Sequence, residues 1–556
     1  MVTDFIKKLV KVFWLLPGFL LWASFPPMGE MVDSLFALAP LLWLSRNRDA
    51  KTSFRRWFLN GFLFWFATLS WMPAIVKNGG PWPLVVLGWG ALSAYCALYF
   101  GAFGWLSAKV WSWAKDEGTA WRKPPRHPYA RRLFAILVAE PVLWCGLELV
   151  RSRFLGGFAW NQLGVVAANS GFGGPAALGG VYLLSAAVVL VNGTVAGIAE
   201  RVIASVRARM GRSHDAAALS RWRSLETLMA FALIWGVYGA ARAEREARAA
   251  AADARTVKVA LVQRNFPCCF KEPEGDPAGI YSNLLAAVSA TQPDLVVLPE
   301  SAMSEVGAVD GAAALRFAAG ISRQAGGAAV LAGGGRADAA RRLYNSAALY
   351  RYGAGGTVRE VYDKVHLVPF GEFIPLDKWI TALQRFAPVG SCTPGEPKLL
   401  KLAAGGRIVP FGVAICYEDT DSALMRAYAR MGARFLCFIT NDSWFSDSVE
   451  AEAHAWQATV RAVETGLAVA RVGNSGVTGT IAPDGSASWL VGTDLRPLVD
   501  ARGAMADRVA APASPRLAPY VVLGDRPLKT IFALLILAMI MVKYKHERER
   551  RRRLPV

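Results

Sequence analysis

Four side chains that could cooperate in chemistry lie where apolar, strand-like runs of the sequence turn polar. Glu300 ends the run "DLVVLPE", Lys364 and Glu372 surround a Pro-Gly turn in "DKVHLVPFGE", and Cys416 lies in "GVAICYED". A thiol becomes a nucleophile when a base removes its proton, and a buried carboxylate can serve as that base. A lysine and a backbone N–H can stabilise the oxyanion that follows. The set is therefore the one that acyl transfer needs.

Each of these residues alone also has an ordinary explanation. A strand-end glutamate or a single lysine is usually a solvated charge, and a strand-end cysteine is often core. The sequence holds seven cysteines. Cys437 alternates within an apolar strand and is expected to be buried, and Cys392 lies in a loop-like stretch. Cys268 and Cys269 are adjacent without a second Cys or His cluster, so neither a zinc site nor any other metal or cofactor is predicted.

Long apolar runs must position this set, because they occupy much of the rest of the chain. A bilayer span needs about 20 apolar residues, and the runs near that length predict about eight spans. They are Leu9–Phe25, Leu35–Leu44, Phe58–Val76, Trp82–Trp111, Leu133–Leu149, Ala176–Ala199, Leu228–Ala241 and Leu528–Val542. The second run is short, and a buried helix is an alternative for it. Cys96 and Cys145 fall within these runs.

Positive charge alternates along the loops between these runs. Lys and Arg gather in every second loop, at the N-terminus and in the tail "KYKHERERRRRLPV". Short cytoplasmic loops retain such residues, so both termini are predicted to be cytoplasmic. The net charge of +20 then has an ordinary cause, which disfavours a nucleic-acid partner. The first run ends in "WASFPP" without a cleavage site, so it is interpreted as a retained anchor and not as a signal peptide.

A stretch of mixed charge and Gly-rich turns precedes the last apolar run. Its strand-like segments are 257–263, 294–300, 328–334, 346–352, 408–419, 434–441, 467–474 and 477–485. Continuous apolar runs of this kind are typical of strands buried on both faces, with helices such as "HAWQATVRAVET" covering them. We therefore expect a membrane domain over 1–243, an α/β domain over 244–522 on the exported side, and a last span with a basic tail over 523–556.

The motifs in this chain resemble those of the nitrilase superfamily, and within it the bacterial apolipoprotein N-acyltransferases. The resemblance covers "DKVHLVPFGE", the Pro-Glu that ends at Glu300, and "CYE" beginning at Cys416. It extends to "LVQRNFP", "ITNDSWFSD", "GFAWNQLG" and a His454, Gln457, Arg461, Glu464 pattern. It implies an α-β-β-α sandwich inserted before the last span.

This resemblance also implies a role for each matching residue. Cys416 would be the nucleophile, Glu300 the general base and then acid, and Lys364 the stabiliser of the tetrahedral intermediate. Glu372 would hold Lys364 or help to orient the site. Tyr417, Glu418 and four possible substrate-binding aromatics complete the set: Trp160, Phe370, Trp444 and Phe445.

The implied reaction moves an acyl chain in two steps. Cys416 would take the chain from a phospholipid, phosphatidylethanolamine in the family, as a thioester. The N-terminal amine of a diacylglyceryl-cysteine apolipoprotein would then accept it, giving mature triacylated lipoprotein. The resemblance implies a monomer in the bacterial inner membrane without cofactors.

Two other functional classes stay open on sequence alone. A membrane-tethered nitrilase-type amidase would use the same Glu, Lys and Cys with water as acceptor, and a transporter with an exported domain is the non-enzyme alternative. Few charges lie in the spans and no internal repeat marks two halves, which disfavours transport. Three positions depart from the family pattern: Glu272 after Lys271, Ala159, and Ser443.

Overall fold

The computed structural model describes residues 14–115, 128–209, 216–251, 255–267, 276–353, 356–369, 371–374 and 391–551. The chain forms two compact units. A helical unit comprises Met1–Ser70, Val86–Ala241 and Leu523–Val556, and an α/β unit comprises Trp71–Val85 and Arg242–Val522. The short segment Trp71–Val85 thus packs with the α/β unit.

The helical unit consists of helices that range from one turn to about ten. Their bounds are α2 Leu16–Ala23, α3 Met31–Ala37, α4 Ala39–Asn47, α5 Ala50–Thr68, α6 Trp82–Lys115, α7 Pro128–Phe134, α8 Glu140–Arg151, α9 Leu163–Ala167, α10 Ala176–Arg209, α11 Ala216–Ala251 and α17 Arg526–Arg551. Within the described residues, five helical segments are long and apolar enough to cross a membrane. They are Ala50–Asn78, Trp82–Lys115, Tyr129–Arg151, Ala176–Ile203 and Arg526–Lys545.

The remaining predicted spans have a different form. Leu35–Leu44 is divided between α3 and α4, where Pro40 lies in the first turn of the second helix. Proline is favoured there because a first-turn N–H needs no helical partner. The described part of Leu9–Phe25 forms only the short α2, and Leu228–Ala241 is part of α11. A count of about eight spans therefore stays a prediction.

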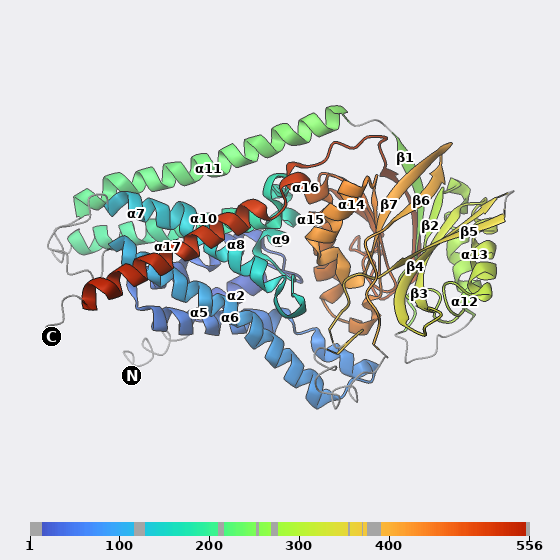
Figure 1. Cartoon of the computed structure of the whole chain (residues 1–556), viewed down its shortest axis with the longest axis horizontal. Coiled ribbons are helices and arrows are strands. Elements are labelled where there is room, and N and C mark those ends of the chain that lie inside the picture. Colours follow the sequence, from blue (N-terminus) through green and yellow to red (C-terminus); the bar gives the residue numbers. More distant parts are fainter. Residues whose placement is uncertain are drawn as a thin grey trace. The chain divides into compact units, whose positions relative to one another are not determined.

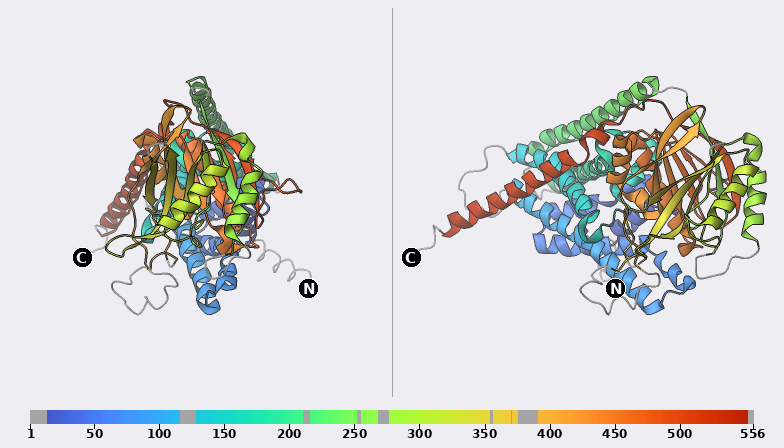
Figure 2. Two further views of the ribbon diagram at one scale, coloured as in Figure 1. Left: turned by 90° about the vertical axis from the view of Figure 1, so that its right-hand side faces the viewer. Right: turned by 45° about the vertical axis from the view of Figure 1, so that its right-hand side comes forward.

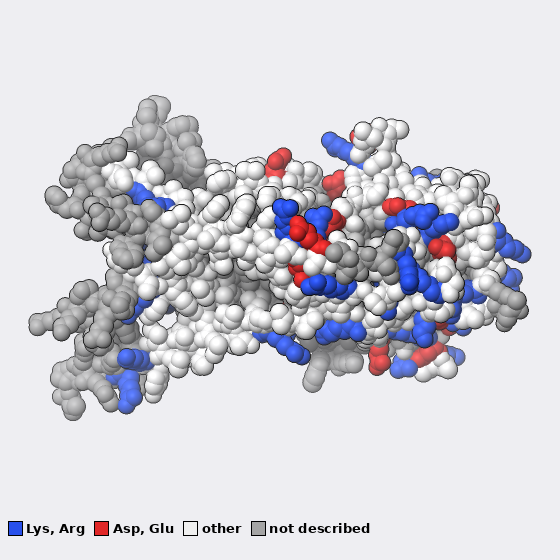
Figure 3. All heavy atoms as spheres, turned by 90° about the horizontal axis from the view of Figure 1, so that it is seen from above, with Lys and Arg blue, Asp and Glu red and all other residues white. Residues whose placement is uncertain are grey.

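The surface of the long helices is apolar. On α17 the side chains of Leu534, Leu537 and Ile540 are all more than half exposed. The face seen in Figure 3 carries a broad stretch without charged side chains over the helices, whereas Lys, Arg, Asp and Glu are frequent over the α/β unit. Exposed apolar surface of this extent costs free energy in water and is compatible with lipid. These helices fit a membrane protein.

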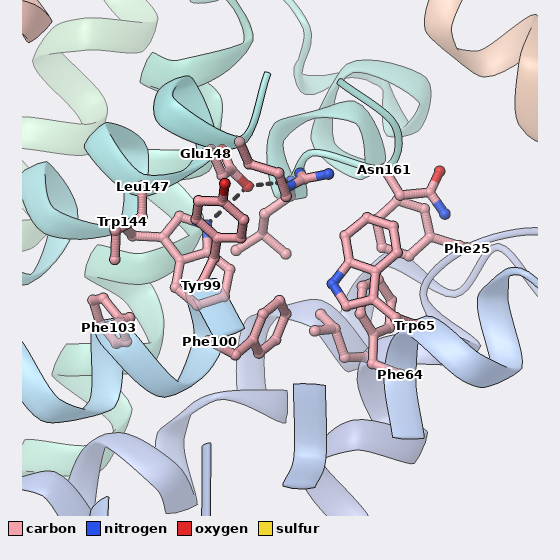
Figure 4. A pocket seen from close by; sticks show the side chains of 13 residues that line it. Phe25, Phe64, Trp65, Tyr99, Phe100, Phe103, Trp144, Leu147, Glu148 and Asn161 are labelled. Atoms are coloured by element: carbon pink, nitrogen blue, oxygen red, sulfur yellow. Dashed lines mark hydrogen bonds between the residues drawn. The ribbon is translucent and has the colours of Figure 1, made fainter. Parts of the chain in front are cut away.

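Aromatic rings and polar groups share the interior of the helical unit. Figure 4 shows a pocket walled by rings that include Phe64, Trp65 and Phe100, with Glu148 on its polar side. The Glu148 carboxylate accepts hydrogen bonds from the Trp144 indole N–H and from the Leu163 backbone N–H, at 2.9 and 2.8 Å. A buried carboxylate without such donors would be costly. The Oε1 oxygen of this carboxylate is therefore held by two local donors.

The α/β unit contains two six-stranded sheets. The first has the order β12-β1-β2-β3-β4-β5 and the second β11-β10-β9-β8-β7-β6. The strands are β1 Thr256–Gln263, β2 Leu295–Val297, β3 Ala329–Ala337, β4 Leu343–Gly353, β5 Gly356–Asp363, β6 Leu399–Ala404, β7 Arg407–Ile415, β8 Leu436–Thr440, β9 Val469–Gly473, β10 Gly479–Ile481, β11 Ala487–Trp489 and β12 Gly503–Ala510.

Helices cover the outer face of each sheet. Helices α12 Pro277–Ala286 and α13 Ala312–Gln324 lie beside the first sheet, and α14 Ser422–Met431 and α15 Glu450–Thr465 beside the second (Figure 1). In both views of Figure 2, α12 and α13 (yellow-green) keep their place on the outer face of the first sheet. A core of buried side chains such as Val262, Leu298 and Val330 joins that sheet to its helices. The unit is thus an α-β-β-α sandwich.

All eight strand-like segments of the sequence correspond to strands, and four further strands had no prediction. The four are β5, β6, β11 and β12, and each is an outermost strand of its sheet. Edge strands bury less of their surface, so their sequences alternate or carry charge, as in "GTVREVYD" of β5. Continuous apolar runs therefore found only the inner strands.

Strand direction brings the polar strand ends together. Strands β1, β2 and β3 are parallel neighbours in the first sheet, and β7, β8 and β9 are parallel neighbours in the second. Glu300 lies just beyond β2, Cys416 directly follows β7, and Asp442 lies just beyond β8. Carboxyl ends of parallel strands meet at one edge of a sheet, where α/β folds bind their ligands.

Candidate active site

Cys416 occupies a strained position at the end of β7. Its φ of +54° lies in the left-handed region, which non-glycine residues seldom adopt. The residue opens a short 3₁₀ turn, Cys416–Thr420, and its side chain is only partly buried. Burial raises the pKa of the thiol well above its ordinary value, the charge of Glu300 raises it further, and that of Lys364 lowers it. The resting thiol is therefore protonated and needs a base during attack.

Glu300 has the properties of such a base. It is buried, with 7% of its surface exposed. Burial raises the pKa of its carboxyl above the ordinary value, Lys364 opposes this and Glu372 adds to it. One carboxylate oxygen, Oε1, accepts a hydrogen bond of 2.8 Å from the Asn345 side-chain amide. A raised pKa makes the carboxylate a stronger proton acceptor at neutral pH.

Lys364 lies between two carboxylates. Its Nζ is 2.9 Å from Glu372 Oε1 and 4.0 Å from Glu300 Oε1, and the side chain is 1% exposed. Burial alone would lower the pKa of the ammonium group, but Glu372 and Glu300 hold it above its ordinary value. A charge that is buried and fixed in this way is well suited to stabilise an oxyanion.

Asn345 on β4 joins the two carboxylates and was not found from the sequence. Its Nδ2 donates to Glu300 Oε1 at 2.8 Å and to Glu372 Oε1 at 2.6 Å. Glu372 also accepts the Val368 N–H at 2.8 Å, so its carboxylate is held on both oxygens. A polar amide within the otherwise apolar segment "YNSAAL" was the available signal. Asn345 and Glu372 together fix Glu300 and Lys364 in place.

Glu418 accepts hydrogen bonds from the backbone next to both Cys416 and Lys364. Its fully buried carboxylate accepts the backbone N–H of Ile415 at 2.8 Å, just before Cys416. It also accepts the N–H groups of Val365 and His366, just after Lys364, at 2.6 and 3.0 Å. Burial raises the pKa of Glu418 to about 7. One side chain thereby fixes the backbone beside two site residues.

A buried charged network includes Asp419 of the Cys416–Thr420 turn. His454 Nε2 is 3.1 Å from Asp419, and its Nδ1 is 2.9 Å from Asp442. Arg471 contacts the same two carboxylates at 2.5 and 3.5 Å. Burial would lower the pKa of His454, but Asp419 leads the groups that raise it to about 10. The ring is therefore an imidazolium ion at neutral pH, and the network is charge-balanced.

Within the described residues, one group could offer ligands to a metal ion. Oxygen and nitrogen atoms of Asp442, Glu450 and His454 lie within 4.8 Å of one another. The protonated ring and the Arg471 guanidinium already supply positive charge to Asp442. We therefore assign this cluster a structural role and no metal.

The other predicted site residues are placed as follows. Trp444 and Phe445 lie half-buried in the 3₁₀ turn η8, Asp442–Phe445, which follows β8. Tyr417 lies next to the nucleophile, edge-on to the His366 ring. Trp160 is buried in the helical unit, where its carbonyl accepts a hydrogen bond from Arg151. Phe370, Cys268, Cys269 and Glu272 lie outside the described residues.

Two family models match the chain, one in each part. Residues 17–194 match the apolipoprotein N-acyltransferase N-terminal domain, and residues 258–510 match the carbon-nitrogen hydrolase model. Among solved structures, amidases from Nesterenkonia sp. AN1 are similar. One mutant amidase shares 20% identity with a TM-score of 0.35, covering 49% of this chain and 98% of its own. The match to the carbon-nitrogen hydrolase model identifies the α/β unit as a nitrilase-like domain.

Curated relatives match both parts together. The apolipoprotein N-acyltransferase of Geobacter metallireducens is 30% identical over 474 residues, which is 84% of each chain. That of Haemophilus influenzae is 26% identical over 537 residues, covering 92% of this chain and 91% of its own. With the catalytic-type geometry in the α/β unit and the apolar helices beside it in sequence, the chain belongs to the apolipoprotein N-acyltransferase family.

Proposed function

We propose that this protein acylates the N-terminal amine of diacylglyceryl-cysteine apolipoproteins, using a phospholipid as acyl donor and Cys416 as carrier. The carrying observation is the buried Lys364, which lies 2.9 Å from Glu372 and 4.0 Å from Glu300. The charges of Glu300 and Lys364 also act on the Cys416 thiol. A base, a fixed cation and a nucleophile together form the set that acyl transfer needs.

The first half-reaction forms a thioester. Glu300 takes the thiol proton while Cys416 Sγ attacks the ester carbonyl of the phospholipid. Lys364 stabilises the oxyanion of the tetrahedral intermediate. When the C–O bond breaks, Glu300 donates this proton to the leaving glycerol oxygen, and a lysophospholipid departs. General-base assistance is needed because burial disfavours a free thiolate at this position.

The second half-reaction uses the same groups, with Cys416 now as the leaving group. The neutral α-amine of the apolipoprotein attacks the thioester carbonyl, and Glu300 accepts the proton that the amine nitrogen loses. Collapse of the intermediate breaks the C–S bond, and Cys416 recovers its proton from Glu300. The product is a triacylated lipoprotein, and the alternation of two substrates on one cysteine is a ping-pong scheme.

The apolar helices support this choice of substrates. Both substrates keep acyl chains in a bilayer, and the helical unit offers segments long enough to cross one. We propose a monomer with about eight spans in the bacterial inner membrane, with both termini cytoplasmic and the α/β unit on the periplasmic side. We propose domain bounds of 1–243, 244–522 and 523–556 and no cofactor.

A mass-spectrometric experiment tests the carrier role. Purified protein is incubated with phosphatidylethanolamine carrying a labelled acyl chain, and peptides are searched for the acyl mass. We expect the label on the Cys416 peptide, lost on hydroxylamine treatment and absent in Cys416→Ala. Label on a different residue, or full transfer by Cys416→Ala, would contradict the proposed mechanism.

The product separates transfer from hydrolysis. When a diacylglyceryl lipopeptide is added to the labelled enzyme, we expect the label in an N-acylated lipopeptide. Release of free fatty acid alone would favour the alternative, a membrane-tethered nitrilase-type amidase with water as acceptor. A lipopeptide with a blocked amine is the matched control and should receive no label.

A further inference from the structure

The segment that follows α5 is built into the α/β unit. Residues Trp71–Val85 belong to that unit although they are far from it in sequence. They include the 3₁₀ helix η1, Met72–Asn78, which ends at Gly79 with a φ of +90°. The end of a helix long enough to cross a membrane therefore reaches the domain that carries the site.

Asn78 forms the central contact of this segment with the η8 turn. Its side-chain Nδ2 donates to the carbonyl of Ser443 at 3.1 Å and to that of Trp444 at 2.9 Å. Asn78 is buried, with 8% of its surface exposed. One amide group thus satisfies two successive carbonyls, which fixes the backbone direction of the turn.

Two further contacts flank this amide. The Trp71 ring packs edge-on against Phe445, with centroids 4.6 Å apart. Lys77 pairs with Asp447 at 3.1 Å, but both side chains are more than 60% exposed. A solvent-exposed ion pair contributes little. The buried amide and the aromatic contact therefore carry the attachment.

The position of η8 matters to the nucleophile. The turn begins at Asp442, which the His454 ring joins to Asp419 of the Cys416–Thr420 turn, at 2.9 and 3.1 Å. The charge of Asp442 also raises the pKa of both Cys416 and Glu300. Trp444 and Phe445 follow it directly and are half-buried. A thioester reacts with an amine instead of water only where water is kept away, and apolar rings that cover the carrier would serve that purpose.

We propose that Asn78 is a positioning residue for acyl transfer: it holds the η8 turn so that its aromatic side chains shield the Cys416 thioester from water. This inference rests on the proposed thioester mechanism. Asn78 does not touch the reacting atoms and acts through the backbone of Ser443 and Trp444.

The experiment compares water and amine as acceptors. Asn78→Asp keeps the size of the side chain but replaces the donor by an acceptor that faces two carbonyls. Thioester enzyme is prepared with labelled phospholipid, lipopeptide is added, and the ratio of free fatty acid to N-acyl lipopeptide is measured. We expect this ratio to rise about 10-fold in Asn78→Asp. Lys77→Ala, the neighbouring control, should keep the wild-type ratio.

The ratio separates positioning from stability, because loss of folded enzyme lowers both products equally. If Asn78→Asp yields little folded protein, Trp71→Leu removes the ring contact and leaves the two hydrogen bonds in place, and a smaller rise is expected. Unchanged ratios in the folded variants would overturn the proposal. Absence of any thioester in the wild type would instead overturn the proposed function.

Discussion

At the scale of single residues, the site depends on how a few buried groups share charge and hydrogen bonds. Lys364 stays positive because two carboxylates outweigh its burial, and Glu300 becomes a better base because burial outweighs the nearby lysine. Asn345 donates hydrogen bonds to both carboxylates. Changing one partner therefore changes the properties of the others.

Removing the lysine tests the oxyanion role. We expect Lys364→Ala to fold and to slow single-turnover acylation of Cys416 by about 100-fold or more, because one fixed donor of this kind contributes that much. Lys398→Ala is the matched control, since its exposed ammonium donates to the Val361 carbonyl. Near-normal acylation by Lys364→Ala would refute the role.

Changing the charge next to the base should shift the pH dependence. Glu372 raises the pKa of Glu300, and acylation needs Glu300 ionised, so the rate should rise with pH through that pKa. In Glu372→Gln the negative charge is absent, so the rise in rate should occur at lower pH. The plateau rate should also be lower, because Lys364 loses its charged partner at 2.9 Å. Single-turnover rates between about pH 4 and 9 measure this. An unshifted rise would contradict the coupling.

At the scale of elements, the site is formed where strand ends from both sheets meet. His454 on α15, Arg471 on β9, and Asp419 and Asp442 in the turns that follow β7 and β8 form one buried network. In the first sheet, Gly333 of β3 lies close to the backbone of Glu300, just beyond β2. Tight backbone approach and buried charge pairing set the relative positions of the site residues.

A glycine on β3 makes room for the base. A Cβ added to Gly333 would lie 2.7 Å from the Glu300 Cα and 3.1 Å from the Pro299 carbonyl oxygen, so this backbone must shift. We expect Gly333→Ala to slow acylation about 10-fold or more, since displacement of a catalytic group by about 1 Å is costly. Gly335→Ala, two residues along, meets only an atom at 4.0 Å and should retain activity. Equal rates in both variants would argue against this requirement.

The buried imidazolium should make stability depend on pH. The folded-state pKa of His454 is about 10, above the ordinary 6.5. Its stabilisation is therefore fully present below about pH 6.5 and is lost as pH rises through about 10. His454→Gln leaves buried carboxylates without this partner and should destabilise by about 3–5 kcal/mol.

Thermal unfolding from about pH 7 to 10 tests that expectation. The wild type should lose stability over this range, and His454→Gln should lose distinctly less. His366→Gln is the control because its ring is partly exposed and contacts one carboxylate at 3.4 Å. The same slope in wild type and His454→Gln would show that a different group titrates.

At the scale of the whole molecule, function depends on joining a bilayer-compatible helical unit to a nitrilase-like domain. The apolar surface of α17 and the long α6 and α10 fit lipid, and the two family models match the two parts separately. Nitrilase-like folds support many reactions. Access to membrane-held acyl chains is what distinguishes the proposed transfer from soluble amide hydrolysis.

Reporter fusions test the orientation of the chain. Basic loops and the basic tail predict cytoplasmic termini. A reporter that is active only in the cytoplasm should work at the C-terminus and fail when inserted in the exposed turn at Gly405–Gly406 between β6 and β7. A periplasmic reporter should give the opposite pattern. Activity of the cytoplasmic reporter at the turn would reverse the proposed topology.

The sequence alone determined the chemical set, the inner strands and the apolar helices. Strand periodicity and polar strand ends pointed to Glu300, Lys364 and Cys416, because each of these residues lies where a continuous apolar run ends. The edge strands were not predicted, because half-exposed strands lack a continuous apolar run.

The tertiary structure decided what depends on long-range proximity. Asn345 joining two carboxylates, Glu418 joining the backbone near Cys416 and Lys364, and Asn78 bound to η8 are contacts between segments far apart in sequence. No local pattern encodes them, because each is an ordinary polar residue until folding brings its partner within hydrogen-bond distance. The pKa shifts likewise arise from burial and neighbours that only the fold supplies.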